Sequence, residues 1–197
     1  MKRVGVFLLA FTAIAVMFSA SAVAQIQTGG DNSVYFVTYY SNNVSGAPDG
    51  TLRLINDGDT SYTLYADIYV FDDSQELVAC GSCSITPDGL LSEDVKTELT
   101  NNPLTGRVPS RGVIKVISDK YINNQFDPFG IAGLRGWATH IQRATPTSGV
   151  YATTETPVAD SNLTEGEGAM LGNLCYFAGQ LGSGQGLITC TAEDHDF

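Results

Sequence analysis

Residues 62–71 alternate between two kinds of side chain, and this pattern constrains the fold more than any other in the sequence. In an extended chain, one face would be aliphatic: Leu64, Ala66, Ile68 and Val70. The opposite face would carry polar and tyrosine side chains: Thr63, Tyr65, Asp67 and Tyr69. A period of two residues is typical of an antiparallel strand with one face on a core and the other in water. We therefore predict a half-buried β-strand here.

Other short segments are rich in β-branched and aromatic residues and are separated by turn formers, which predicts further strands. The predicted ranges are 33–40, 51–56, 76–80, 112–118, 134–143, 150–157 and 187–191. Residues 112–118 are apolar on both faces apart from Lys115, which indicates a central strand. Pro157 removes a backbone donor, which places 150–157 at a sheet edge.

Two short helices complete the expected elements. Ser92 is a suitable N-cap, Val95 and Leu99 lie four residues apart, and Asn101-Asn102-Pro103 would end that helix. Residues 163–181 are moderately helical with glycine interruptions. We expect a mainly β protein: an antiparallel two-sheet β-sandwich, immunoglobulin-like, with one or two short helices. A jelly roll or a small barrel is the alternative.

The N-terminus has the pattern of a secretory signal peptide. Lys2 and Arg3 precede an apolar run at 4–18, and Ala22-Val23-Ala24 is an A-x-A cleavage site. The run is short for a bilayer span, and no later stretch has the roughly 18 to 20 apolar residues of a membrane helix. We expect a signal peptide at 1–24, a single domain at 25–197, and a secreted or periplasmic location without membrane insertion.

The expected location determines the oxidation state predicted for the four cysteines, which are Cys80, Cys83, Cys175 and Cys190. In an oxidising compartment they predict two structural disulfides, and four cysteines allow three connectivities. A redox CxxC would open a helix after a core strand, and a four-thiolate zinc site would need closer spacing of the second pair. Pairing each of Cys80 and Cys83 with one C-terminal cysteine is favoured over a local ring, and no metal is expected.

Charge restricts the class of partner. The formal net charge is −11, and it becomes two units more negative once Lys2 and Arg3 are removed. Residues 144–197 contain seven acidic residues and no Lys or Arg. Such a surface repels phosphate backbones, so nucleic-acid binding is not expected.

No catalytic residue and no cofactor are predicted. His140 is expected to be a partly exposed sheet residue, and there is no G-x-S-x-G motif. The glycine-rich run 182–186 follows a predicted helix instead of a strand and has no lysine nearby, so a flexible turn is preferred to a phosphate-binding loop. Acidic turns offer oxygen ligands for calcium, but they do not match the spaced loop of a known calcium site, so solvated turns are preferred. Their carboxylates are Asp57, Asp59, Asp72, Asp73 and Glu76.

Tyrosines form the one candidate ligand face. Tyr35 and Tyr39 share a face of the first strand, and Tyr65 and Tyr69 share a face of the third. If the two faces coincide, the four rings would form a platform for sugar rings or a partner protein. Ordinary cross-strand pairing on a half-exposed sheet is the alternative interpretation.

The segment IYVFDDSQELVACGSC followed by TPDGLL, the later LRGWATHIQ, and GSGQG before the last cysteine resemble a group of uncharacterised secreted bacterial proteins. The resemblance implies a single exported domain and carries no activity. We therefore predict an exported, non-enzymatic β-sandwich acting in surface interaction or adhesion, with an unknown protein or glycan as partner. A carbohydrate-binding module using the tyrosine face is the alternative, and an enzyme of unrecognised type ranks third.

Overall fold

The structure is a computed structural model, and it describes residues 33–41, 46–143 and 151–190. The predicted signal peptide at 1–24 lies outside these residues. The strands are β1 (Tyr35–Tyr40), β2 (Thr51–Asn56), β3 (Leu64–Asp72), β4 (Leu77–Ile85), β5 (Leu90–Asp94), β6 (Gly112–Asp119), β7 (Leu134–Arg143), β8 (Tyr151–Pro157) and β9 (Ala159–Asp160). The helices are the π-helical turn η1 (Val95–Leu99) and the α-helix α1 (Glu165–Gln180).

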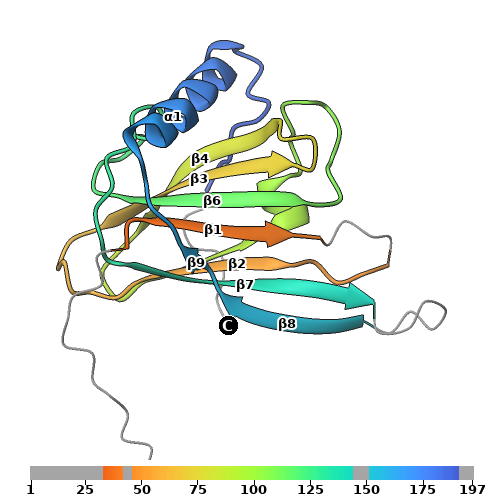
Figure 1. The fold of residues 1–197 in the computed structure, drawn as a ribbon, viewed down its shortest axis with the longest axis horizontal. Coiled ribbons are helices and arrows are strands. Elements are labelled where there is room, and N and C mark those ends of the chain that lie inside the picture. The colour runs from red at the N-terminus through yellow and green to blue at the C-terminus, as the bar shows by residue number, and fades with distance from the viewer. Residues whose placement is uncertain (1–32, 42–45, 144–150, 191–197) are drawn as a thin grey trace, which may run out of the picture. The chain divides into compact units, whose positions relative to one another are not determined.

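The strands form two antiparallel sheets, one of five strands in the order β4-β3-β6-β1-β9 and one of four in the order β5-β2-β7-β8 (Figure 1). This confirms the predicted two-sheet β-sandwich. β6 is central and β8 is an edge strand, both as predicted. The strand order differs from that of a constant-type immunoglobulin domain, so the likeness to that class lies in the two-layer packing of antiparallel sheets.

The main core lies between the sheets. Alternate residues of β3 turn toward it, and Leu64, Ala66 and Ile68 are fully buried. Leu52 and Leu54 of β2 face them from the other sheet and are also fully buried. The period of two predicted from the sequence therefore places the correct aliphatic face inward.

Part of the outer face of the five-stranded sheet is also buried, because α1 packs against it. Leu171, Cys175 and Ala178 of α1 form a second core with Tyr69 and Ile117 of the sheet. Figure 1 shows α1 beside β4 and β3. The helix predicted within 163–181 is thus present, and Thr164 caps it by accepting the N–H of Glu167. The prediction that β3 is half-buried is wrong, since both of its faces are covered.

The other predicted helix differs from expectation. Ser92 lies inside β5, and the helical residues are the five of η1. The capping group comes from a distant loop: the carboxylate of Asp49 accepts the N–H groups of Lys96 and Thr97 at 3.0–3.1 Å. Ser92 was a misleading signal because an N-cap residue type is also common in exposed strands and turns.

The C-terminal part of the chain follows β4 without forming the predicted strand at 187–191. Leu187 makes one isolated parallel bridge to Cys80, and Thr191 lies outside the described residues. Backbone hydrogen bonds join Ile188 to Cys80 and Cys80 to Gly186, each at 2.8 Å. Among the described residues, no helix combines the length and apolar character needed to cross a bilayer.

Candidate functional site

The two cysteines of β4 bond to different layers of the molecule. Because they are three residues apart in a strand, Cys80 points outward and Cys83 points inward. Cys80 bonds to Cys175 of α1, with a Cα–Cα distance of 5.8 Å across 95 residues of sequence. Cys83 bonds to Cys190 across 107 residues, with a Cα–Cα distance of 5.4 Å. Two disulfides with cross-pairing are therefore confirmed. The strand predicted at 76–80 extends further, as β4, and the odd spacing of the two cysteines within it excludes a local ring.

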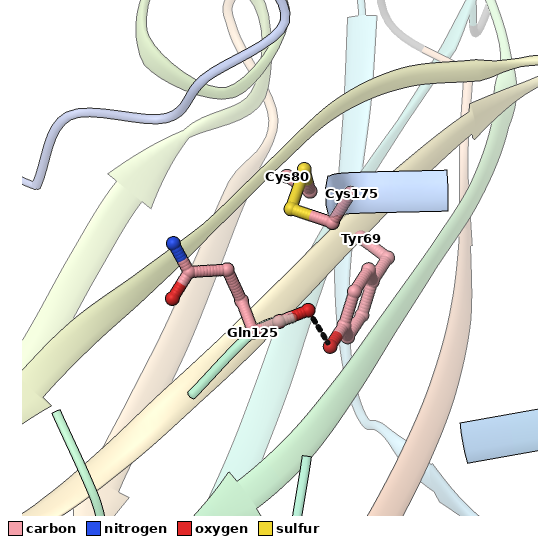
Figure 2. The surroundings of a disulfide bond; sticks show 4 residues. All are labelled: Tyr69, Cys80, Gln125 and Cys175. Atoms are coloured by element: carbon pink, nitrogen blue, oxygen red, sulfur yellow. Dashed lines mark hydrogen bonds between the residues drawn. A yellow bond between two sulfur atoms is a disulfide. The ribbon is translucent and has the colours of Figure 1, made fainter. Parts of the chain in front are cut away.

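The Cys80–Cys175 disulfide fixes α1 over the tyrosine face. Figure 2 shows it beside the ring of Tyr69, whose hydroxyl donates a 2.8 Å hydrogen bond to the backbone carbonyl of Gln125. Gln125 belongs to the loop between β6 and β7, and this loop also packs on α1. Gly172 of α1 makes the approach feasible, because a Cβ there would lie 2.4 Å from the Phe126 carbonyl oxygen.

The predicted platform of four exposed tyrosines is wrong. Tyr35 and Tyr69 do share the second core beneath α1, but Tyr35 is 3% exposed and Tyr69 is fully buried. The Tyr35 hydroxyl donates to Glu167 of α1 at 2.8 Å. Tyr65 is half-buried, and Tyr39 alone is exposed, with its ring stacked on His140 at a centroid distance of 4.1 Å. Tyr35 and Tyr69 are buried because α1 packs over them, so a ligand cannot reach their rings.

A pair of buried acidic side chains lies on the same sheet, and the sequence did not predict it. Asp67 and Asp119 are both fully buried on the outer face of β3 and β6. The two oxygens of Asp67 meet no well-formed hydrogen bond among the described residues, and neither does the Ser82 hydroxyl on the neighbouring position of β4. A single Asp in an alternating strand looks like a solvent-facing residue, so no sequence signal marked it.

Asp119 differs from Asp67 in being fully hydrogen-bonded. It accepts the backbone N–H groups of Lys120, Tyr121 and Phe129 and the amide of Asn124, at 2.5–2.9 Å. These bonds organise the loop that covers the pair. Burial raises the pKa of Asp67 to about 8, with the Ser82 hydroxyl opposing the rise and the charge of Asp119 adding to it. At neutral pH the raised pKa keeps Asp67 protonated in the folded protein.

A second buried acid lies on the other side of β4. Glu93 of β5 is 3% exposed and points into the space between the sheets. One of its carboxylate oxygens and the sulfurs of Cys83 and Cys190 all lie within 4.8 Å of one another. Burial raises the pKa of Glu93 to about 7, and the acidic side chains of Glu98 and Asp94 add to the rise. Because Cys83 and Cys190 are joined in a disulfide, neither is a thiolate that could bind a metal.

Asp72 and Asp73 of the acidic turns use their carboxylates within the fold. Asp72 closes its turn by accepting the N–H groups of Ser74 and Glu76 at 2.9 and 3.0 Å. Asp73 pairs with Arg111 at 2.8 Å. His140 is 4% exposed, so the prediction of a partly exposed residue is wrong. Its Nε2 lies 3.0 Å from the Thr156 hydroxyl, and burial lowers its pKa.

An exposed apolar stripe runs along α1. It consists of Met170, Leu174, Phe177 and Leu181, here called the α1 seam, and their 4-3-4 spacing places them on one side of the helix. Phe177 is 66% exposed and Leu181, just after the helix, is 65% exposed. Three residues of the seam, Leu174, Phe177 and Leu181, line an open groove of about 510 Å³, which Leu77 and Leu104 also line.

The α1 seam was not predicted from the sequence, although the 4-3-4 spacing of its apolar residues is visible there. Leu171, Cys175 and Ala178 of α1 are buried in the second core, whereas Met170 and Phe177 of the seam are exposed and Leu174 lies between the two, half-buried against that core. α1 has no Lys or Arg, and its acidic residues Glu165 and Glu167 lie in the first turn. Glu167 contacts Lys115 of β6 at 2.5 Å, which ties the start of the helix to the sheet.

No protein-family model matches the sequence, and no curated protein matches it. Two solved structures are similar in part. The crystal structure of Thermotoga maritima 1070 aligns with a TM-score of 0.44 and 15% identity over 68% of this chain and 97% of that one. The Anabaena sensory rhodopsin transducer aligns with a TM-score of 0.39 and 9% identity over 61% of this chain and 95% of that one. Neither likeness carries a functional argument.

Proposed function

We propose that this protein is a non-enzymatic extracytoplasmic interaction module, and that the α1 seam binds an amphipathic helix of a partner protein. The observation that carries the proposal is the exposed 4-3-4 apolar stripe beside an open groove. The buried residues of α1 pack in the domain's own core, and the exposed residues of the seam provide a surface for another helix. Apolar groups gathered on one surface, rimmed by polar residues, are typical of interaction sites.

The surface is held in place before a partner arrives. The Cys80–Cys175 disulfide, the Tyr35–Glu167 hydrogen bond and the Lys115–Glu167 ion pair all fasten α1 to the sheet. A rigid surface loses little conformational freedom on binding, which favours affinity. The groove also has the form that recurs when a helix lays its apolar face against a concave surface.

Charge indicates the chemistry of the partner. Within the groove Glu76 is the charged residue, and α1 itself has only acidic charges. A partner helix with Lys or Arg flanking its apolar stripe would complement this surface and be steered toward it. The whole chain, with a net charge of −11, would repel an acidic partner.

Two considerations support the extracytoplasmic part of the proposal. Two disulfides that close long loops are typical of proteins that mature in an oxidising compartment. The N-terminal pattern of a signal peptide agrees with that compartment. The carbohydrate-binding alternative has lost its basis, since Tyr35 and Tyr69 are buried beneath α1.

The proposal is tested by calorimetric titration with a designed Leu/Lys amphipathic helix. A scrambled peptide of the same composition controls for charge alone. Phe177→Glu places a charge in the α1 seam, and Leu90→Glu makes the same change at a residue of β5 that is 52% exposed. We expect Phe177→Glu to weaken binding by at least about tenfold, which is about 1.4 kcal/mol, with Leu90→Glu unchanged. Equal affinity of the scrambled peptide, or equal effects of the two substitutions, would overturn the proposal.

A further inference from the structure

The two disulfides occupy different environments. Cys80 and Cys175 are both fully buried between β4 and α1. Cys83 is fully buried as well, but its partner Cys190 is half-buried and lies at the end of the described chain. An attacking thiolate must reach a sulfur of the disulfide, so access alone makes Cys83–Cys190 the reactive pair.

An acidic side chain accompanies the accessible disulfide. Glu93 is buried with one carboxylate oxygen within 4.8 Å of both sulfurs. The buried sulfur of Cys83 cannot reach a solvent proton when the bond breaks, and a thiolate left in an apolar core is costly. Glu93 is the acid placed to supply that proton.

We propose that Cys83–Cys190 is an exchange-active disulfide, with Glu93 as the proton donor to Cys83 on reduction and the proton acceptor on oxidation. A thiolate of a dithiol reductant attacks the Cys190 sulfur, the sulfur–sulfur bond breaks, and the electron pair leaves with Cys83. Glu93 transfers its proton to the Cys83 thiolate and becomes a carboxylate. The second thiol of the reductant then displaces Cys190, which is protonated from solvent. The protein gains two electrons, and the dithiol becomes a disulfide.

The fold can accommodate this cycle without unfolding. Backbone hydrogen bonds at 2.8 Å join Ile188 to Cys80 and Cys80 to Gly186, so the C-terminal segment stays on β4 when the disulfide opens. Gly81 permits that close approach, since a Cβ there would lie 2.7 Å from the Ile188 carbonyl oxygen. The two thiols therefore remain close enough to reoxidise.

Two charged groups accompany Glu93 and affect its titration. Glu98 reaches it from η1, and Asp94 follows it in β5. Across the sheet, its neighbour in β2 is Leu52, which is uncharged. Both acidic neighbours favour the protonated form of Glu93, which is the form that donates. The reduction rate should therefore depend on the protonation of Glu93 as well as on that of the attacking thiol.

The test uses the whole native protein in dithiothreitol, followed by alkylation and mass mapping of each cysteine over time. We expect Cys83 and Cys190 to be alkylated at least about tenfold faster than Cys80 and Cys175, which serve as the internal control. Equal rates for the two disulfides would overturn the proposal without any variant.

The role of Glu93 is tested by Glu93→Gln, which keeps the shape but removes the proton. We expect reduction of Cys83–Cys190 to slow by about tenfold below about pH 7, and its pH profile to follow the reductant's thiol alone. Reduction of Cys80–Cys175 should keep its wild-type rate. Glu98→Gln, which leaves the donor in place, should retain the fast reaction. An unchanged pH profile in folded Glu93→Gln would show that Glu93 does not transfer the proton.

Discussion

Asp67→Asn is the most informative perturbation of the buried acid pair. Asparagine has the shape of the protonated acid and can donate to Asp119, but it cannot ionise. Burial raises the pKa of Asp67 from 3.8 to about 8 in the folded protein. The substitution therefore removes a titration and leaves the packing of β3, β4 and β6 in place.

The sign of the effect follows from that shift. Below about pH 4 Asp67 is protonated in both the folded and the unfolded state, so it adds no pH dependence. Between about pH 4 and pH 8 the unfolded chain releases the proton and the folded chain retains it, so the free energy of unfolding falls as pH rises. A shift of this size corresponds to about 6 kcal/mol well above pH 8, and to about 5 kcal/mol at pH 8, where the folded group is half-titrated.

Urea denaturation of the oxidised protein at about pH 4, 6 and 8 measures the effect. We expect Asp67→Asn and wild type to be equally stable at the lowest pH, and the variant to be more stable by several kcal/mol, up to about 5, at the highest. The difference between the two proteins isolates Asp67 from Glu93, which titrates in an overlapping window in the same direction. Parallel stability curves at all three pH values would refute the assignment of a buried neutral Asp67.

Three further substitutions test other parts of the structure. Asp119→Ala removes the acceptor of four hydrogen bonds in the β6–β7 loop, and we expect a loss of roughly 2–4 kcal/mol in denaturation and faster proteolysis of that loop. Replacing Cys80 and Cys175 by serine removes a loop constraint of about 4–5 kcal/mol, and hydrogen exchange should then report faster opening in α1 than elsewhere. Gly81→Ala forces a contact with Ile188, so its melting temperature should fall while that of Gly166→Ala, where a Cβ meets open space, should not.

The alternating pattern of β3 predicted the inner core correctly but not the fate of the opposite face. Tyr65, Asp67 and Tyr69 have the polar character of side chains that face solvent. The local sequence pattern does not show whether such a face contacts water or is covered by a helix from elsewhere in the chain. The cover depends on α1, which is distant in sequence and is joined to β4 by the Cys80–Cys175 disulfide. The platform of exposed tyrosines failed for that reason.

The disulfide pairing was only partly predictable. An odd spacing in a strand sends Cys80 and Cys83 to opposite faces, which excludes the local ring once β4 is known to continue through both residues. Which C-terminal cysteine joins which face depends on where α1 docks, and sequence spacing does not contain that information. The two-residue strand β9 was also missed, since so short a segment has no periodicity to detect.

We propose that the α1 seam is the surface at which this protein binds a helix of a partner protein. Hydrogen-exchange mass spectrometry of the native, oxidised protein with and without the Leu/Lys peptide tests that claim most directly. We expect new protection in α1 and in the groove residues around Leu77 and Leu104, with none on the open face of the sheet β5-β2-β7-β8. Protection confined to that sheet, with α1 unchanged, would contradict it.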